Sequence, residues 1–257
     1  MSLAAGDRIT LSVVSHGQAA LIGELLRSLG RHCRSPIELV ITSNLPEPLD
    51  LPADVGFPLR RIVNATPRGF GENHNAAFRQ SGGEYFCVLN PDIRFTADPF
   101  PELLGQLRRE AGAGVVAPLV TTPDGALEDS ARDFPTPWSI LKKFFGWNRD
   151  RQTLGEKLGS DAVEVDWVAG MFMLFPRQVF ADLGGFDERY FLYYEDVDLC
   201  DRLHHSGFRV LIAPGAGVVH DARRDSHRKL HYLRWHLASM LRFFLFHFLR
   251  RWRRVAR

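Results

Sequence analysis

The first half of the chain alternates between short apolar runs and segments with helical spacing. Ile9–His16 and Ile37–Asn44 are apolar runs with the length of buried strands. Between them, Leu21, Leu25 and Leu29 recur at the spacing of one helix face. Strands that alternate with helices favour a doubly wound, parallel α/β sheet. This alternation excludes all-helical and all-β architectures.

The alternation continues to about the middle of the chain. Further strands and helices are expected, in order, at Leu59–Ala65, Phe70–Gln80, Tyr85–Asn90, Pro101–Glu110 and Gly114–Val120. Ligands of such sheets bind beyond the carboxyl ends of the strands. We therefore expect a binding site near Ser15–Gly17, Ser43–Asn44 and Asn90–Asp92.

The second half is less regular. Thr121–Gly159 is rich in turn formers, which predicts a long loop region. Val163–Phe175 is strongly apolar, and a helix at Tyr194–Ser206 and a strand at Arg209–Ala213 are expected after it. Leu230–Trp252 has apolar residues at helical spacing and predicts a long final helix.

Composition excludes several other classes of protein. Hydrophobic residues make up 45% and charged residues 24% of the 257 residues, which is typical of a packed globular chain and not of a disordered one. The three cysteines form no CxxC pair, so a cysteine-based zinc site is excluded. Reduced thiols and the absence of a recognisable signal peptide favour a cytoplasmic protein. No apolar run reaches the roughly 20 residues of a membrane span.

The charge is distributed unevenly between two parts of the chain. Residues 223–257 carry 11 Lys or Arg and one Asp or Glu, whereas residues 1–222 carry 21 and 29. We expect an α/β domain at 1–222 and a basic, amphipathic helical extension at 223–257. A basic tail on an acidic body predicts an anionic partner, either membrane phosphate or nucleic acid.

The apolar stretch within this tail narrows the choice of partner. Leu237–Leu249 is too short to span a bilayer, and arginines follow it directly at positions 250, 251, 253, 254 and 257. An apolar helix beside basic residues is typical of a helix that lies on an anionic membrane surface, which would make the protein peripheral at the inner face of the cytoplasmic membrane. The alternative is a helix that packs its phenylalanines on the protein core. No nucleic-acid partner is expected, because no recognised binding motif is present.

Two segments offer ligands for a metal ion. Asn90-Pro91-Asp92 ends an apolar strand, where a carboxylate can hold a divalent cation against a phosphate. His220 ends another apolar run, and a neutral imidazole is a frequent metal ligand. The alternatives are a simple strand-ending turn at Asn90–Asp92 and an ordinary histidine at position 220.

A third segment concentrates acidic residues. Glu195, Asp196 and Asp198 lie within four positions at the start of a predicted helix. One acidic residue suffices to cap a helix, so capping alone does not account for all three. Like charges this close raise one another's pKa, which suits a general base.

The order of these segments is more specific than any one of them. Arg68-Gly69-Phe70-Gly71 opens a helix and could hold a phosphate, although it lacks the GxGxxG spacing of a dinucleotide-binding dehydrogenase. Together with Asn73-His74-Asn75, YFCVLNPD at 85–92, GGFDE at 184–188, FLYYEDVDLCDR at 191–202 and VVH at 218–220, it resembles the family 2 glycosyltransferases. Within that family the chain is similar to the rhamnosyltransferase-like branch, in which LNPD replaces the DxD motif.

The resemblance implies a fold, a reaction and a cofactor. It implies a GT-A fold, with a mostly parallel sheet, and an inverting, metal-dependent glycosyltransferase. Such an enzyme moves a sugar, with rhamnose as the candidate, from a nucleotide-diphosphate donor to a hydroxyl of a glycan or polyprenyl-linked acceptor in cell-surface polysaccharide synthesis. The implied cofactor is Mg²⁺ or Mn²⁺, and a homodimer is left open.

The resemblance also implies roles for single residues. Asp196 matches the catalytic base, with Glu195 beside it, and Asp92 and His220 match the metal ligands. The residues expected to bind the donor are Ser15, Asn44, Arg68, Gly69, Asn75, Asn90 and Asp92. The residues expected to contact the acceptor are Trp167, Gly170 and Asp198.

Two departures from the family pattern leave the donor undefined. The family usually has an Asp-Asn pair after the second strand and a Tyr-Asn or Phe-Asn pair after the first, whereas this chain has Ser43-Asn44 and His16-Gly17. The nucleobase and the sugar of the donor therefore remain undefined. The alternatives are an inactive homologue that binds a nucleotide-sugar or glycan, and a nucleotidyltransferase on a similar sheet.

Overall fold

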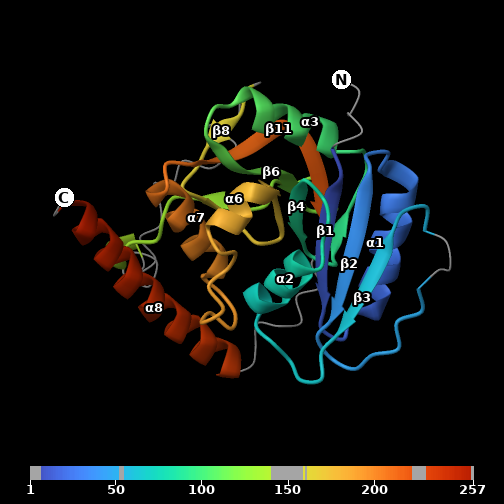
Figure 1. Ribbon diagram of the computed structural model, residues 1–257, viewed down its shortest axis with the longest axis horizontal. Coiled ribbons are helices and arrows are strands. Elements are labelled where there is room, and N and C mark those ends of the chain that lie inside the picture. The colour runs from blue at the N-terminus through green and yellow to red at the C-terminus, as the bar shows by residue number, and fades with distance from the viewer. Residues whose placement is uncertain (1–6, 52–54, 140–158, 160, 222–229, 256–257) are drawn as a thin grey trace.

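The computed structural model describes residues 7–51, 55–139, 159, 161–221 and 230–255 (Figure 1). Outside these described residues lie residues 140–158 of the loop region expected at Thr121–Gly159, the boundary expected between residues 222 and 223, and Arg257.

The first half folds as its hydrophobic pattern predicts. Eight strands and helices match the predicted segments to within a few residues, and a short strand, β5, lies among them. In chain order they are β1 (Ile9–Ser15), α1 (Ala19–His32), β2 (Ile37–Ser43), β3 (Leu59–Val63), α2 (Phe70–Arg79), β4 (Tyr85–Leu89), β5 (Ile93–Arg94), α3 (Phe100–Arg109) and β6 (Ala113–Thr121).

The second half contains more short strands than its pattern suggests. The apolar run at Val163–Phe175 is divided among three strands, and the strand expected at Arg209–Ala213 continues to His220. The described elements are β7 (Ala131–Arg132), β8 (Val163–Glu164), β9 (Trp167–Val168), β10 (Phe172–Pro176), α6 (Arg177–Asp182), α7 (Glu195–His205), β11 (Arg209–His220) and α8 (Leu230–Val255).

The strands form a mixed sheet in the order β3-β2-β1-β4-β10-β6-β11-β5, with β8 beside β11. The pairs β1–β2, β2–β3, β1–β4 and β6–β11 are parallel. The central strand β10, however, is antiparallel to both β4 and β6. The predicted α/β class is confirmed. β10 departs from a wholly parallel sheet, as do the short strands β5 and β8, which pair antiparallel with β11. β7 and β9 pair separately as a small second sheet.

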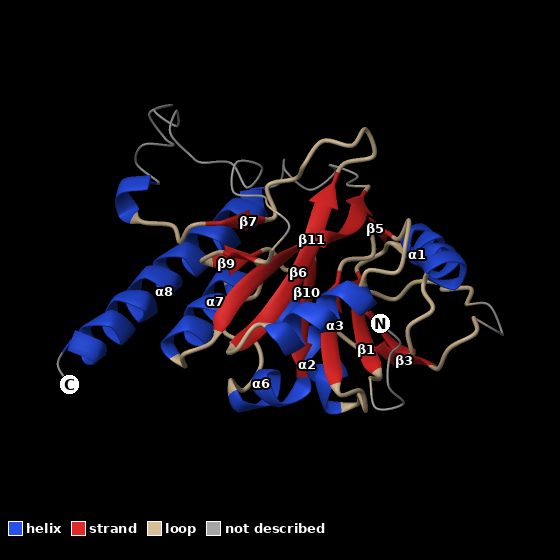
Figure 2. Cartoon of the chain, turned by 90° about the horizontal axis from the view of Figure 1, so that it is seen from above, coloured by secondary structure: helices blue, strands red, loops and turns tan. Residues whose placement is uncertain are grey.

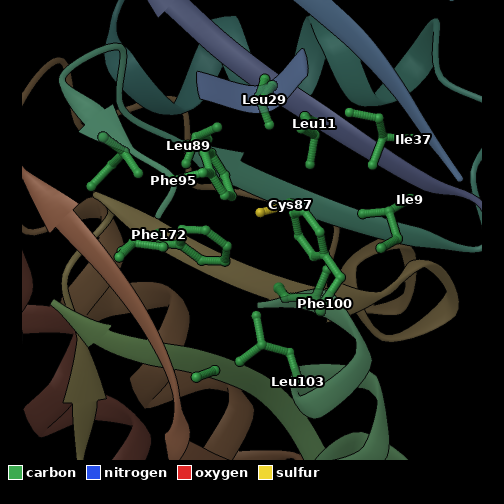
Figure 3. Close-up of a cluster of buried hydrophobic side chains, with 14 of the residues drawn as sticks. Ile9, Leu11, Leu29, Ile37, Cys87, Leu89, Phe95, Phe100, Leu103 and Phe172 are labelled. Carbon is green, nitrogen blue, oxygen red and sulfur yellow. The ribbon is translucent and has the colours of Figure 1, made fainter. Parts of the chain in front are cut away.

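The two faces of the sheet bury two separate apolar clusters. In β4, Cys87 and Leu89 pack into one cluster with α1 and α3, and Phe86 and Val88 pack into the other with α2, α6 and α7. This alternation follows from the two-residue period of a strand. Figure 3 shows the first cluster, and Figure 2 shows the strands layered between the helices. A sheet covered on both faces exposes only its strand ends to ligands.

Helix α8 lies along one end of the molecule, beside α7 (Figures 1 and 2). Its inner face buries Ser239 and Phe243, whereas Leu237, Leu241 and Leu245 on the outer face are exposed. Both apolar surfaces expected in this segment therefore exist, on opposite faces of one helix. No helix within the described ranges is long and apolar enough to cross a membrane.

Arg250 faces the protein and not a solvent-exposed basic end. Its guanidinium pairs with Asp198, at 2.7 Å, and with Asp201. Both carboxylates belong to α7 and are almost completely buried, and Asp201 Oδ1 also accepts from His247 Nδ1 at 2.6 Å. The expectation that Arg250 serves as one of the lipid-facing arginines is therefore wrong. Its charge offsets the buried acids of α7.

Replacing this arginine should destabilise the fold. Arg250→Ala would leave two buried carboxylates without their main partner from α8, and breaking a buried pair on one side typically costs about 3–5 kcal/mol of unfolding free energy. Arg234→Ala, on the exposed side of the same helix, is the matched control and should change it by less than about 0.5 kcal/mol. Urea unfolding of the two variants checks the difference. Equal unfolding free energies of the two variants would contradict a stabilising role for the pairing of Arg250 with the buried acids of α7.

Candidate active site

Asp92 and His220 meet at the edge of the sheet. The short strand β5 follows Asp92 directly and pairs Ile93 with His220 at the end of β11. The Asp221 N–H donates to the Asp92 carbonyl at 2.9 Å, which fixes the two segments side by side. As a result, His220 Nε2 lies 3.2 Å from Asp92 Oδ2. The two residues expected to hold a metal are thus neighbours in space, 128 positions apart in sequence.

Glu128 joins this pair and was not predicted from the sequence. Its Oε2 lies 3.0 Å from His220 Nδ1, so both ring nitrogens face carboxylates. Burial lowers the pKa of His220, but hydrogen bonds and charge from Asp92 and Glu128 outweigh burial and raise it to about 9. The second oxygen of Asp92, Oδ1, is buried and has no hydrogen-bond partner among the described residues.

The donor set suits a hard divalent cation only with ligands from elsewhere. Carboxylate oxygen and neutral imidazole both bind Mg²⁺ or Mn²⁺, and the unpartnered Oδ1 of Asp92 is a free ligand atom. Among the described residues, however, no group of three or more His, Cys, Asp or Glu side chains could hold an ion by itself. Asp92 and His220 therefore fit a metal that shares its coordination with a bound substrate.

A loop connects this edge to the acidic helix α7. The Asn90 N–H donates to the Met171 carbonyl at 3.0 Å, because the start of β10 lies beside the end of β4. One residue earlier, the Gly170 N–H donates to Asp196 Oδ2 at 2.9 Å. This chain of contacts brings Asp196 to the same edge of the sheet as Asp92.

Glu195 and Asp196, which we call the ED pair, differ in their surroundings. Burial and the neighbouring Asp196 raise the pKa of Glu195 well above its usual range, and Glu195 Oε2 meets no hydrogen-bond partner in the described part of the chain. Burial also raises the pKa of Asp196, but hydrogen bonds from the Gly170 and Val197 amides and the charge of Arg132 oppose the rise. Glu195 is therefore the carboxyl that keeps its proton, and Asp196 is the one that ionises first.

Arg132 is a second functional candidate that sequence reasoning missed. It lies in β7, and its guanidinium stands 5.5 Å from the centre of the Trp167 ring in β9. The pairing of these two short strands holds the cation close enough to influence Asp196. Neither Glu128 nor Arg132 belongs to a local motif, and only the folding of a turn-rich segment brings them to the site.

The residues expected to bind the donor divide into two groups. Asn44 uses its side chain on the backbone of Arg68: it accepts from the N–H at 2.8 Å and donates to the carbonyl at 2.9 Å. This bidentate contact places the loop at Arg68 and Gly69 beside the end of β2. Gly69 has no room for a side chain, because a Cβ there would lie 2.9 Å from the Phe191 carbonyl oxygen.

The remaining predicted donor residues are built into the frame of the site. Asn75 is buried, accepts from the Phe186 N–H at 2.9 Å and donates to Glu188 at 3.0 Å. Ser15 is buried at the end of β1 and accepts from the Gln18 N–H. Asn90 directly follows β4 and is half-buried, two positions before Asp92. The polar side-chain atoms of Asn75 and Ser15, which we expected to bind the donor, form hydrogen bonds that hold the loops of the site.

The residues expected to contact the acceptor also separate. The Gly170 amide holds Asp196, and Trp167 Nε1 donates to the Asp133 carbonyl while its ring packs under Arg132. Asp198 is completely buried and pairs with Arg202 at 2.8 Å as well as with Arg250. An acceptor cannot reach this carboxylate, so its predicted role is corrected to a structural one.

Comparison with known proteins assigns this arrangement to a family. The family model described as "Glycosyltransferase like family 2" matches residues 7–236. The chain belongs to glycosyltransferase family 2. This glycosyltransferase is 29% identical over 243 residues to the N-acetylglucosaminyl-diphospho-decaprenol L-rhamnosyltransferase of Mycobacterium tuberculosis, covering 86% of this chain and 78% of that one. It is also 29% identical to the rhamnosyltransferase WbbL of Escherichia coli, covering 91% and 92%.

Solved structures support the GT-A fold. GalNAc-T7, determined with UDP, GalNAc and Mn²⁺, superposes with a TM-score of 0.64 at 15% identity, over 84% of this chain and 43% of that one. The mannosyltransferase PcManGT of Pyrobaculum calidifontis, determined with GDP-Man and Mn²⁺, gives a TM-score of 0.57 at 18% identity, over 91% and 64%. The glycosyltransferase thus spans less than two thirds of either chain.

The ED pair gives a first test of the site. Asp196→Asn removes the only ready proton acceptor of the pair and should lower turnover by about 10²-fold or more. Glu195→Gln mimics a carboxyl that is already protonated and should lower turnover by less than about tenfold. Steady-state release of nucleoside diphosphate measures both. The reverse ranking would move the base to Glu195.

The same variant has a stability signature of known sign. Because the pKa of Glu195 is raised in the fold, its stabilising contribution is present at low pH and is lost as the pH rises. Glu195→Gln should therefore gain melting temperature relative to the wild type between about pH 5 and about pH 8. Thermal unfolding across this range checks it, and a constant difference would contradict the protonated state.

Proposed function

We propose that this glycosyltransferase moves rhamnose from a nucleotide-diphosphate donor to a hydroxyl of a lipid-linked glycan, with inversion and with a divalent metal. The observation that supports the proposal most is the convergence of Asp92, His220 and Asp196 at one edge of the sheet. The names of the mycobacterial and Escherichia coli relatives support rhamnose, and the mycobacterial name supports a diphospho-polyprenyl acceptor.

Asp92 and His220 would hold Mg²⁺ or Mn²⁺ in this reaction. When bound, the ion neutralises the developing charge of the nucleoside diphosphate that leaves. Asp92 offers its unpartnered Oδ1, and His220 offers Nε2 once that nitrogen has lost its proton. Glu128 accepts from His220 Nδ1 and so directs Nε2 towards the site, which is the usual arrangement of a carboxylate behind a metal-binding histidine.

Asp196 would act as the base. Its Oδ2 is held by the Gly170 amide, and its Oδ1 accepts from the Val197 N–H, so the carboxylate has a fixed orientation. By accepting the proton of the acceptor hydroxyl, Asp196 would make the hydroxyl oxygen a stronger nucleophile while the bond between the sugar and the diphosphate breaks. Glu195 remains a neutral acid beneath it. Release of nucleoside diphosphate, and not pyrophosphate, would distinguish this reaction from nucleotidyl transfer.

Metal dependence is tested at Asp92. Asp92→Asn keeps the size of the side chain and removes its charge, so donor affinity should fall about tenfold or more with Mn²⁺ present and change little without it. Thermal shift with a panel of thymidine, uridine and guanosine diphosphate sugars measures the donor affinity and also identifies the nucleobase of the donor. A wild-type affinity that ignores Mn²⁺ would contradict the assignment.

The outer face of α8 would bring the enzyme to an anionic membrane, where a polyprenyl-linked acceptor is presented. Leu233, Leu237, Leu241 and Leu245 recur every four residues along this face and are 45–66% exposed. Apart from Arg250, which pairs with α7, the helix contains five arginines and no acidic residue, so it complements anionic lipid and would repel a second copy of itself. These features support a peripheral enzyme at the inner face of the cytoplasmic membrane.

Vesicle binding tests this surface. The wild type should sediment with vesicles of phosphatidylglycerol, and a Leu237→Ser/Leu241→Ser variant should bind at least about tenfold more weakly, because two exposed apolar contacts are lost. Ala238→Ser on the same outer side is the control. Loss of dimer in place of loss of vesicle binding would assign the face to a second copy and overturn the membrane proposal.

A further inference from the structure

The turn that leads into the ED pair has an unfavourable backbone. Tyr193 and Tyr194, which we call the double-tyrosine turn, have φ angles of 70° and 66°. They are the described non-glycine residues with positive φ, and they are consecutive. Such a conformation persists in bulky residues only when surrounding contacts enforce it. Tyr194 is also the residue that precedes Glu195 at the start of α7.

The contacts around this turn come from the inner face of α8. The Ser239 hydroxyl, which is buried, donates to the Leu192 carbonyl at 2.9 Å. The His236 ring lies 5.3 Å from the Tyr193 ring and 5.4 Å from the Tyr194 ring, both edge to face.

The aromatic contacts continue on both sides of the turn. Phe243, fully buried in α8, lies 5.6 Å from the Tyr194 ring. Eight positions earlier in α8, the Trp235 ring lies 4.6 Å from the ring of Phe191. On its other side the same segment is tied to α2, because the Phe70 N–H donates to the Phe191 carbonyl at 2.9 Å.

We infer that the inner face of α8 positions the catalytic carboxylate. Ser239 and His236 hold the double-tyrosine turn in its strained conformation, and the turn thereby sets the orientation of the ED pair that follows it. Ser239 and His236 are positioning residues that reach the reacting atoms only through the turn. This inference rests on the proposed function for its activity readout, but the conformation of the turn can be measured without it.

The test uses the full chain with paired variants on the two faces of α8. Ser239→Ala/His236→Ala removes the hydrogen bond and the ring contacts, and Ala238→Ser on the exposed outer side is the control. The inner variant should lower kcat by roughly tenfold with the donor KM unchanged, and the control should leave kcat unchanged. Hydrogen exchange should accelerate at the amides of residues 193–196 in the inner variant alone.

A second substitution tests the strain itself. Glycine occupies the left-handed region without a steric penalty, so Tyr193→Gly in the inner variant should recover part of the lost kcat. A kcat and an exchange rate that stay at wild-type values in the inner variant, with only its urea stability lowered, would overturn the inference, as would a failure of glycine to recover kcat. A wild type without transfer or donor hydrolysis would refute the proposed function instead, and the exchange measurement would still decide this inference.

Discussion

The hydrogen bond from the Gly170 amide to the Asp196 carboxylate connects the two halves of the site. Gly170 lies two residues before β10, the strand that runs antiparallel between β4 and β6. Because of that direction, the start of β10 lies beside the end of β4, where Asp92 follows. A parallel strand in this place would have put its start at the opposite edge. The reversal of one central strand is therefore what brings a helix-borne carboxylate close to Asp92 and His220, the proposed metal ligands.

The same carboxylate shows how neighbouring acids acquire different roles. Glu195 and Asp196 are adjacent and both resist ionisation because they are buried. Two backbone amides and a nearby arginine support the charged form of Asp196, whereas Glu195 Oε2 meets no donor. Separate roles for two like groups follow from their different partners and not from their residue types.

The sequence predicted what depends on local pattern and failed where distant segments meet. The strands and helices of the first half follow from hydrophobic spacing, and the positions of Asp92 and His220 follow from the ends of strands. Glu128 returns to the site because the chain folds back after β6, where its N–H donates to the Val120 carbonyl at 2.8 Å. No local pattern predicts this contact of Glu128. The pairing of buried Asp198 likewise depends on Arg250 in α8, 52 positions further along the chain.

The charge of the final helix illustrates why composition gives only part of an answer. Counted along the chain, the arginines of the tail suggest a single basic surface for an external anion. In the fold, Arg250 forms ion pairs with carboxylates of α7, and Arg242 lies over the Tyr190 ring. Part of the positive charge of the helix therefore complements the acidic body. Fewer arginines remain for lipid, and the leucine face must supply more of any membrane affinity. Vesicle binding should then depend on salt less steeply than a count of arginines implies, because a screened charge weakens while a buried apolar area does not.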